Sequence, residues 1–174
     1  MICIKLPAIP AAIPAAVPAA LQAVIPAKLP AVLLSMLLAC CPLAQAQSAP
    51  QPRLRTVDVT AGIHIIKTEL AITADQQQTG MMFRRVMGTN EGMLFVNDEP
   101  GVRCFWMRNT LVPLTIAFIA DDGTIINLAD MEAQSDASHC SARPVRYALE
   151  VNRGWFAKRG LKAGLRLQGA PFEK

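Results

Sequence analysis

The first 46 of the 174 residues contain no aspartate or glutamate, and Lys5 and Lys28 are their only charged side chains. Their apolar stretch at residues 31–39 is shorter than the roughly 20 residues that a membrane-spanning helix needs. A positive residue, a short apolar stretch and a small-x-small site are typical of a secretory signal. We therefore predict a signal peptide over residues 1–46, cleaved after Ala46 within Ala44-Gln45-Ala46, and a periplasmic or secreted protein.

Two alternatives concern the same segment. Leu37-Leu38-Ala39-Cys40 resembles a bacterial lipoprotein box, which would anchor the protein to lipid through Cys40. The earlier residues form a low-complexity stretch in which proline recurs about every fourth position, and repeated proline removes helix donors. We expect no packed element there, and a translation start near Val24 would leave an ordinary signal.

Residues 47–174 lack a strong charge of either sign. They carry 15 basic and 13 acidic side chains, a net charge of +2. This excludes a strongly basic nucleic-acid binder, which needs a dense Lys/Arg surface. No transmembrane span is expected after the signal is removed.

The recurrent catalytic and metal-binding spacings are also missing. There is no Gly-x-Ser-x-Gly, Cys-x-x-Cys or His-x-x-x-His, and the carboxylates have no spacing typical of an acid/base pair. A Cys/His dyad would need His64 or His139, and His139 adjoins Cys140, from which it points away on an extended chain. A copper site using the methionines remains an alternative, but methionines in apolar runs usually fill core gaps. We expect neither a cofactor nor a metal.

Residues 47–55 are polar and contain proline, so they are predicted to form a flexible linker before one domain at 56–174. The domain contains short apolar runs separated by turn signals such as Asp121-Asp122-Gly123. No β-α-β spacing is apparent. We predict a mainly β, antiparallel domain, sandwich-like or barrel-like, with one or two short helices. The predicted strands lie at Val57–Val59, Ile63–Ile72, Gly92–Val96, Arg103–Met107, Leu114–Ile119, Thr124–Leu128, Val145–Val151 and Leu165–Leu167.

Two stretches are predicted to be helical. Thr73 is expected to cap a short helix that runs through Gln78 and carries Asp75 in its first turn. The second, at residues 154–160, has basic residues in its last turn and ends in glycine.

Only two cysteines, Cys104 and Cys140, remain after cleavage at Ala46. Two cysteines in an oxidising compartment predict a disulfide, here closing a ring of about 35 residues. The alternative is a pair of separate buried thiols.

The segment Phe105–Thr110 joins an apolar run directly to a polar one. Trp106 is followed by the guanidinium of Arg108, the amide of Asn109 and the hydroxyl of Thr110, a grouping able to orient a polar ligand. The alternative is a strand that ends in a hydrogen-bonded turn before Pro113.

Several blocks in this order are similar to the DUF192 family, also called UPF0127, over about residues 57–168. The resemblance implies a compact β-sandwich or barrel-like fold and often an export signal, and it implies no established activity. The family usually has Pro-Leu-Asp where this chain has Pro113-Leu114-Thr115, and the cysteine pair is familiar from some exported relatives. The matching blocks are Gly80–Arg84, Gly92–Phe95, Phe105–Thr110, Pro113-Leu114, Phe118-Ile119 with Asp122-Gly123, Tyr147–Glu150, and Gly154-Trp155.

We therefore expect an exported binding or envelope accessory module, without a predicted reaction. Its partner is expected to be a small polar ligand, such as a sugar or peptide, or an envelope protein. One alternative is an envelope hydrolase that uses Glu150 as acid or base, and another is a purely structural or interaction domain. The candidate binding residues are Trp106, Arg108, Asn109, Thr110, Glu150 and Trp155.

Overall fold

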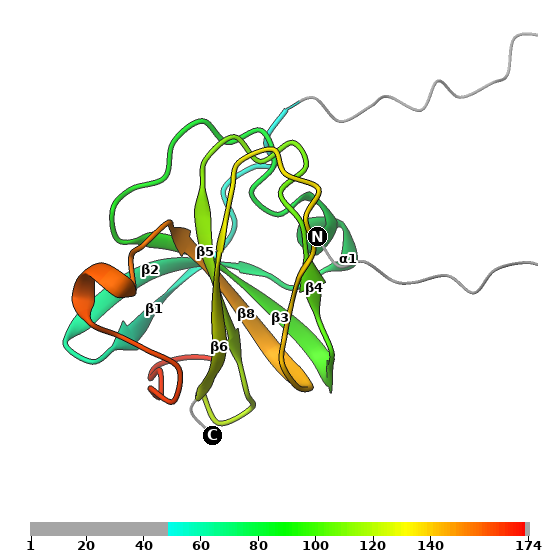
Figure 1. The fold of residues 1–174 in the computed structure, drawn as a ribbon. Helices are drawn as coiled ribbons and strands as arrows, with labels where there is room; N and C mark the ends of the chain where they lie inside the picture. Colours follow the sequence, from blue (N-terminus) through cyan, green and yellow to red (C-terminus); the bar gives the residue numbers. More distant parts are fainter. Residues whose placement is uncertain (1–48, 173–174) are drawn as a thin grey trace, which may run out of the picture. The chain divides into compact units, whose positions relative to one another are not determined.

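The computed structural model describes residues 49–172, so the predicted signal peptide and Cys40 lie outside the described residues (Figure 1). Within that range the chain is mainly β, as predicted. One α-helix and one 3₁₀ helix accompany the strands. The elements are β1 (Thr56–Ala61), β2 (His64–Ala71), α1 (Ala74–Thr79), β3 (Glu91–Gly101), β4 (Cys104–Phe105), β5 (Leu114–Ile119), β6 (Ile125–Met131), β7 (His139–Cys140), β8 (Val145–Asn152) and η1 (Ala157–Arg159).

Six strands form one sheet in the order β1-β2-β3-β8-β5-β6, and β4 pairs with β7 in a separate two-stranded sheet. The pairings are antiparallel, as predicted, except that β2 and β3 run parallel. The physical reason is the connection: residues 72–90, with α1, form a crossover long enough to return the chain in the same direction.

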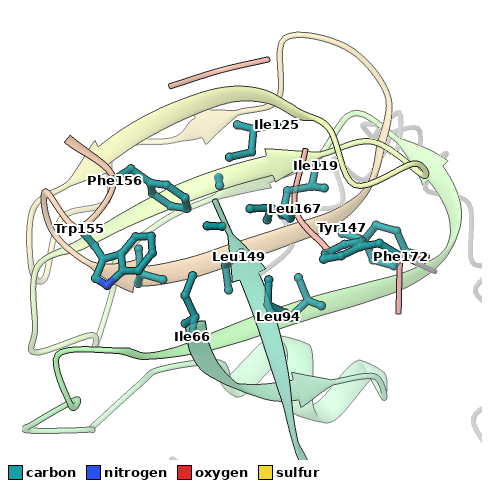
Figure 2. Packing of buried hydrophobic residues seen from close by; sticks show 14 of the residues in the cluster. Ile66, Leu94, Ile119, Ile125, Tyr147, Leu149, Trp155, Phe156, Leu167 and Phe172 are labelled. Atoms are coloured by element: carbon teal, nitrogen blue, oxygen red, sulfur yellow. The ribbon is translucent and has the colours of Figure 1, made fainter. Parts of the chain in front are cut away.

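The sheet packs a hydrophobic cluster on each of its faces. Alternate β8 residues separate the two, because successive strand side chains point to opposite faces: Leu149 lies in the first cluster and Ala148 in the second. In the first cluster Trp155 and Phe156 meet at a ring centroid distance of 5.0 Å, and Tyr147 contacts Phe172 at 5.1 Å (Figure 2). The second cluster contains four buried methionines: Met81, Met93, Met107 and Met131.

The C-terminal segment covers both edges of the sheet. Thr60 in β1 exchanges backbone hydrogen bonds with Gln168, each of 2.9 Å, and the backbone N–H of Ile125 in β6 donates to the Leu165 carbonyl at 2.8 Å. The red end of the ribbon in Figure 1 follows this path. The predicted strand at Leu165–Leu167 is thus reduced to isolated bridges, which satisfy backbone groups that an edge strand otherwise leaves open.

Gly169 allows the C-terminal segment to lie against the edge of the sheet, because its backbone passes directly over β1. Its φ is +92°, and a Cβ atom there would lie 2.6 Å from the Asp58 carbonyl oxygen. Gly164 has a similar φ of +90° but no atom within 4 Å of the same position. We expect Gly169→Ala to cost about 2 kcal/mol more in unfolding free energy than Gly164→Ala, since both add backbone strain and only the first adds overlap. Equal losses in urea denaturation would contradict the close approach.

The two predicted helices differ in outcome. Thr73 caps α1, as predicted. It also forms a complete capping box with Gln76. The second is only the 3₁₀ turn η1, because Gly160 adopts a left-handed conformation after three residues and donates to the Ala157 carbonyl. Within residues 49–172, none of the helices has the length and apolar character required to span a membrane.

Part of the segment predicted as a linker is in contact with the domain. The Gln51 side chain donates to the carbonyls of Gln76 and Gly80 at 3.1 and 2.8 Å. Leu54 packs against the second hydrophobic cluster. These contacts bring Arg53 to the carboxylate of Glu69.

Candidate functional site

The disulfide ties together the two short strands β4 and β7. Cys104 and Cys140 are direct cross-strand partners and are bonded at 2.08 Å, which confirms the predicted pairing in the structure. Behind this bridge, the backbone N–H of Met107 donates to the Ser135 carbonyl at 2.8 Å. The bridge therefore fixes the start of the Phe105–Thr110 segment against the loop after β6.

The Phe105–Thr110 segment forms a turn in which Arg108 contacts neighbouring side chains, whereas the buried Trp106 Nε1 has no hydrogen-bond partner among the described residues. The Arg108 guanidinium stacks 3.9 Å over the Trp106 ring, and its Nε donates to Asp136 at 2.8 Å. Asn109 is exposed, and its carbonyl accepts from the Phe83 N–H at 2.8 Å. Thr110 is buried. Trp106, Arg108 and Asn109 are thus neighbours in one turn, in which Arg108 and Asn109 are exposed and Thr110 is buried.

Glu150 lies away from that surface, on β8 in the middle of the sheet. Its cross-strand neighbours are Met93 on β3 and Ile116 on β5, both members of the second hydrophobic cluster. Burial raises the pKa of its carboxyl from 4.5 to about 7. The structure does not bring Glu150 together with Arg108, which instead pairs with Asp136 at the surface.

This burial predicts a stability that depends on pH. An acid whose folded pKa is raised stabilises the fold fully below its unfolded pKa, and this contribution is lost as the pH rises through about 7. From pH 5 to pH 8 we expect the unfolding free energy of the protein to fall by about 2–3 kcal/mol relative to Glu150→Gln. Urea denaturation at both pH values checks this. Parallel pH profiles for the two proteins would contradict it.

Sequence reasoning missed a second buried glutamate, Glu69, which shares this face of the sheet and also neighbours Met93. Burial raises the pKa of Glu69, but hydrogen bonds from Arg84, the Leu54 N–H and Arg53 outweigh burial and lower it to about 2. Both Arg84 contacts, at 2.5 and 2.9 Å, are buried. The sequence feature that could have indicated a buried charge is Glu69 itself, the single acidic residue within the β-branched run at Ile63–Ile72.

Trp155, the remaining predicted residue, lines a surface cleft of about 450 Å³ that we call the basic cleft. Its indole N–H donates to Asn90 at 3.1 Å, and the Arg159 guanidinium lies 4.1 Å above the ring. The ring is buried, so it forms part of the cleft's support rather than an open stacking platform. The basic cleft is lined by Val86, Met87, Thr89, Val112, Pro113, Asn152, Arg153, Trp155, Lys158 and Arg159.

Three chain segments assemble the basic cleft around the end of β8. The Asn152 side chain donates to the Gly88 carbonyl at 2.8 Å and so holds the loop before β3. The backbone N–H of Arg153 donates to the Pro113 carbonyl at 3.2 Å and holds the segment that follows Thr110. The predicted polar turn therefore leads into one wall of the cleft, although Arg108 and Asn109 do not line it.

The lining is basic and apolar, without an aspartate or glutamate. Arg153 is balanced by Glu132 and Asp130, which are its ion-pair partners outside the lining. Lys158 and Arg159 have no carboxylate within ion-pair distance among residues 49–172. Such a cleft can hold an apolar group and an anionic group side by side.

This chain has Thr115 where the similar family usually has an aspartate, and a carboxylate is instead supplied by the neighbouring strand. Thr115 is the cross-strand partner of Asp130, and its hydroxyl donates to that carboxylate at 2.5 Å while accepting from the Gly154 N–H at 2.8 Å. A carboxylate is therefore present at this place in the fold, carried by β6 instead of β5. It helps to hold Arg153 at the cleft.

The described part of the chain contains no group of three or more His, Cys, Asp or Glu side chains placed to hold a metal ion. The buried methionines lie in the second hydrophobic cluster among aromatic and branched side chains, as core residues do.

The comparison with known families decides the relationship. The DUF192 model, described as an uncharacterized ACR, matches residues 56–169. The chain belongs to the DUF192 family. This match spans the main sheet and the disulfide-tied strands, and it stops just before the last described residues. No curated protein matches the chain.

Two solved structures have the same DUF192-type fold at appreciable sequence identity. One, from Sinorhizobium meliloti 1021, is described as a "putative transcription regulator"; it is 36% identical, with a TM-score of 0.66, over 69% of this chain and 98% of that one. The other, from Novosphingobium aromaticivorans DSM 12444, is described as a protein of unknown function; it is 36% identical, with a TM-score of 0.65, over 72% of this chain and 94% of that one. Neither description defines a biochemical activity for the DUF192 domain.

Proposed function

We propose that this DUF192 protein is an exported binding module whose small ligand occupies the basic cleft. The observation that carries the proposal is the lining itself: exposed apolar side chains lie beside uncompensated cations. Val86 is 76% exposed there, although a valine in a small domain is usually covered. Small-molecule sites combine apolar walls with a few polar groups in this way.

The basic cleft is favoured over the Phe105–Thr110 turn because the cations of the cleft are available to a ligand. Arg108 is already paired with Asp136 and stacked on Trp106. An anionic ligand at that turn would compete with the Asp136 carboxylate for Arg108. At the cleft, Arg153 is the one cation that has a carboxylate partner among residues 49–172.

Binding is favoured over hydrolysis by the place of Glu150. A general acid or base must come within hydrogen-bond reach of the substrate. Glu150 is 4% exposed between Met93 and Ile116, and it is absent from the lining of the cleft. Its raised pKa then reflects burial within the fold.

The ligand site is tested by mapping a panel of cell-wall sugars, short peptides and aromatic carboxylates onto the purified protein by ¹H–¹⁵N NMR. We expect at least one panel member to shift the amides of Thr89, Asn152 and Lys158 while leaving Arg108 and Asn109 unchanged. Shifts confined to Arg108 and Asn109 would move the site to the turn. Absence of any shift would contradict the binding function.

Export is supported by the Cys104–Cys140 disulfide, because such bonds persist in oxidising compartments. We propose a periplasmic or secreted form that begins at Gln47, with lipid anchoring at Cys40 as the alternative. Mass spectrometry of the protein from fractionated cells tests both. An N-terminus at Gln47 supports the soluble form, a diacylglyceryl group on Cys40 supports the anchored form, and an intact precursor in the cytoplasm would contradict export.

A further inference from the structure

We infer that the basic cleft, if it is the ligand site proposed above, selects a small molecule that carries one oxyanion group on an apolar body. The charge pattern of the lining points to the oxyanion. Lys158 and Arg159 are adjacent in the chain, line the cleft and lack a carboxylate partner among residues 49–172. No acidic side chain lines the cleft to repel an anion.

Arg159 is held in place before any ligand arrives. Its Nη1 donates to the Trp155 carbonyl at 3.0 Å and its Nη2 donates to Asn90 at 2.9 Å. Its guanidinium plane is further positioned over the Trp155 ring at 4.1 Å. Because a guanidinium has five N–H donors, three remain for a ligand. A fixed guanidinium loses little side-chain freedom on binding, which favours oxyanion recognition.

Arg153 is less available to an anion than Lys158 or Arg159. Its guanidinium contacts the Glu132 carboxylate directly and lies 3.7 Å from Asp130. Asp130 is in turn fixed by the Thr115 hydroxyl at 2.5 Å. An incoming anion would compete with two carboxylates at Arg153, whereas it meets none at Lys158. Lys158 and Arg159, rather than Arg153, are therefore the side chains expected to meet the oxyanion.

The apolar side chains of the cleft determine the part of the ligand that carries the oxyanion. Val86, Met87, Val112 and Pro113 present apolar surface, and Val86 is largely exposed. A volume of about 450 Å³ lies in the range of small-molecule sites and admits a single-ring or short-chain group. The apolar part covers this wall while the oxyanion meets Lys158 and Arg159. Carboxylates and phosphate monoesters both supply such a group.

The test uses phenylacetate, phenyl phosphate and the neutral phenylacetamide as probes. Trp155 is the only tryptophan left in a Trp106→Phe variant, so its fluorescence reports on the cleft. We expect phenylacetate or phenyl phosphate to bind at least about tenfold more tightly than phenylacetamide, with affinity falling as salt is added. Tighter binding of phenylacetate would indicate a carboxylate ligand, and tighter binding of phenyl phosphate would indicate a phosphate monoester.

Two variants separate charge recognition from general effects. Lys158→Gln should weaken oxyanion binding by about fivefold or more, whereas Lys67→Gln, with the same loss of charge at an exposed position on β2 outside the cleft lining, should change it by less than about twofold. Equal binding of the amide and the oxyanions, or equal effects of the two variants, would overturn the inference while leaving a ligand site in the cleft. If no panel member perturbs Trp155 or the cleft amides, both the inference and the proposed function fail.

Discussion

Replacing Arg84 with methionine is expected to lower the unfolding free energy by about 3–5 kcal/mol at pH 7. Arg84 and Glu69 form a bidentate pair whose side chains are 8% and 4% exposed. Methionine removes the main partner and leaves a carboxylate in a buried position. The cost is large because a buried charge without its partner loses its hydration and gains little in return.

The matched control is Arg53→Met, which removes another contact to the same carboxylate. Arg53 bonds Glu69 at 2.7 Å, but its side chain is 62% exposed. We expect this variant to lose less than about 1 kcal/mol, because surface ion pairs contribute little. Urea denaturation of both variants measures the difference. Similar losses for the two would contradict a buried, Arg84-dependent carboxylate.

The same ion pair has a pH signature. Because the pKa of Glu69 is lowered to about 2, its contribution to stability is present above its unfolded pKa of about 4.5 and is lost as the pH falls toward 2. In Arg84→Met this contribution is mostly absent, so the penalty should shrink as the pH is lowered through that range. A penalty that does not change with pH would indicate that Arg84 acts through packing instead of charge.

Removing the disulfide is expected to cost about 4 kcal/mol in the chain-entropy model, since the bond closes a loop of 36 residues in the unfolded chain. The loop holds β5 and β6, two of the six strands of the main sheet. Cys104→Ala/Cys140→Ala should show this loss in urea denaturation. The wild-type protein unfolded in the presence of reductant should match the double variant.

A small loss would contradict this expectation. If the double variant were within about 1 kcal/mol of the oxidised protein, the bridge would fix only the local β4–β7 pair and not constrain the unfolded chain. Measurement of the midpoint and the slope together separates the two cases, because a changed slope reports on the compactness of the unfolded chain.

Local sequence signals predicted most of the strands and one helix. The β5 strand has the predicted bounds, Leu114–Ile119, because it is a continuous apolar run between Pro113 and a turn. The α1 helix follows its capping residue, Thr73. The parallel pairing of β2 with β3 was not predictable from these signals, since it depends on where the crossover returns the chain.

The candidate site was predicted less well than the fold. Trp155 was selected from the sequence, but Val86 and Val112 have no local feature that marks them as its neighbours. They meet it because Asn152 and Arg153, at the end of β8, hold the two loops that contain them. Glu150 was selected for its charge, and its burial became apparent only from its neighbours on β3 and β5.

Ligand binding in the basic cleft is tested by titrating Val86→Glu and Val102→Glu with the tightest-binding oxyanion probe. Both valines are exposed, at 76% and 61%, so each substitution should leave the fold intact. Only Val86 lines the cleft, where a new carboxylate would oppose an anion. We expect at least about a tenfold loss of affinity for Val86→Glu and unchanged binding for Val102→Glu. Equal affinities in the two variants would contradict binding in the cleft.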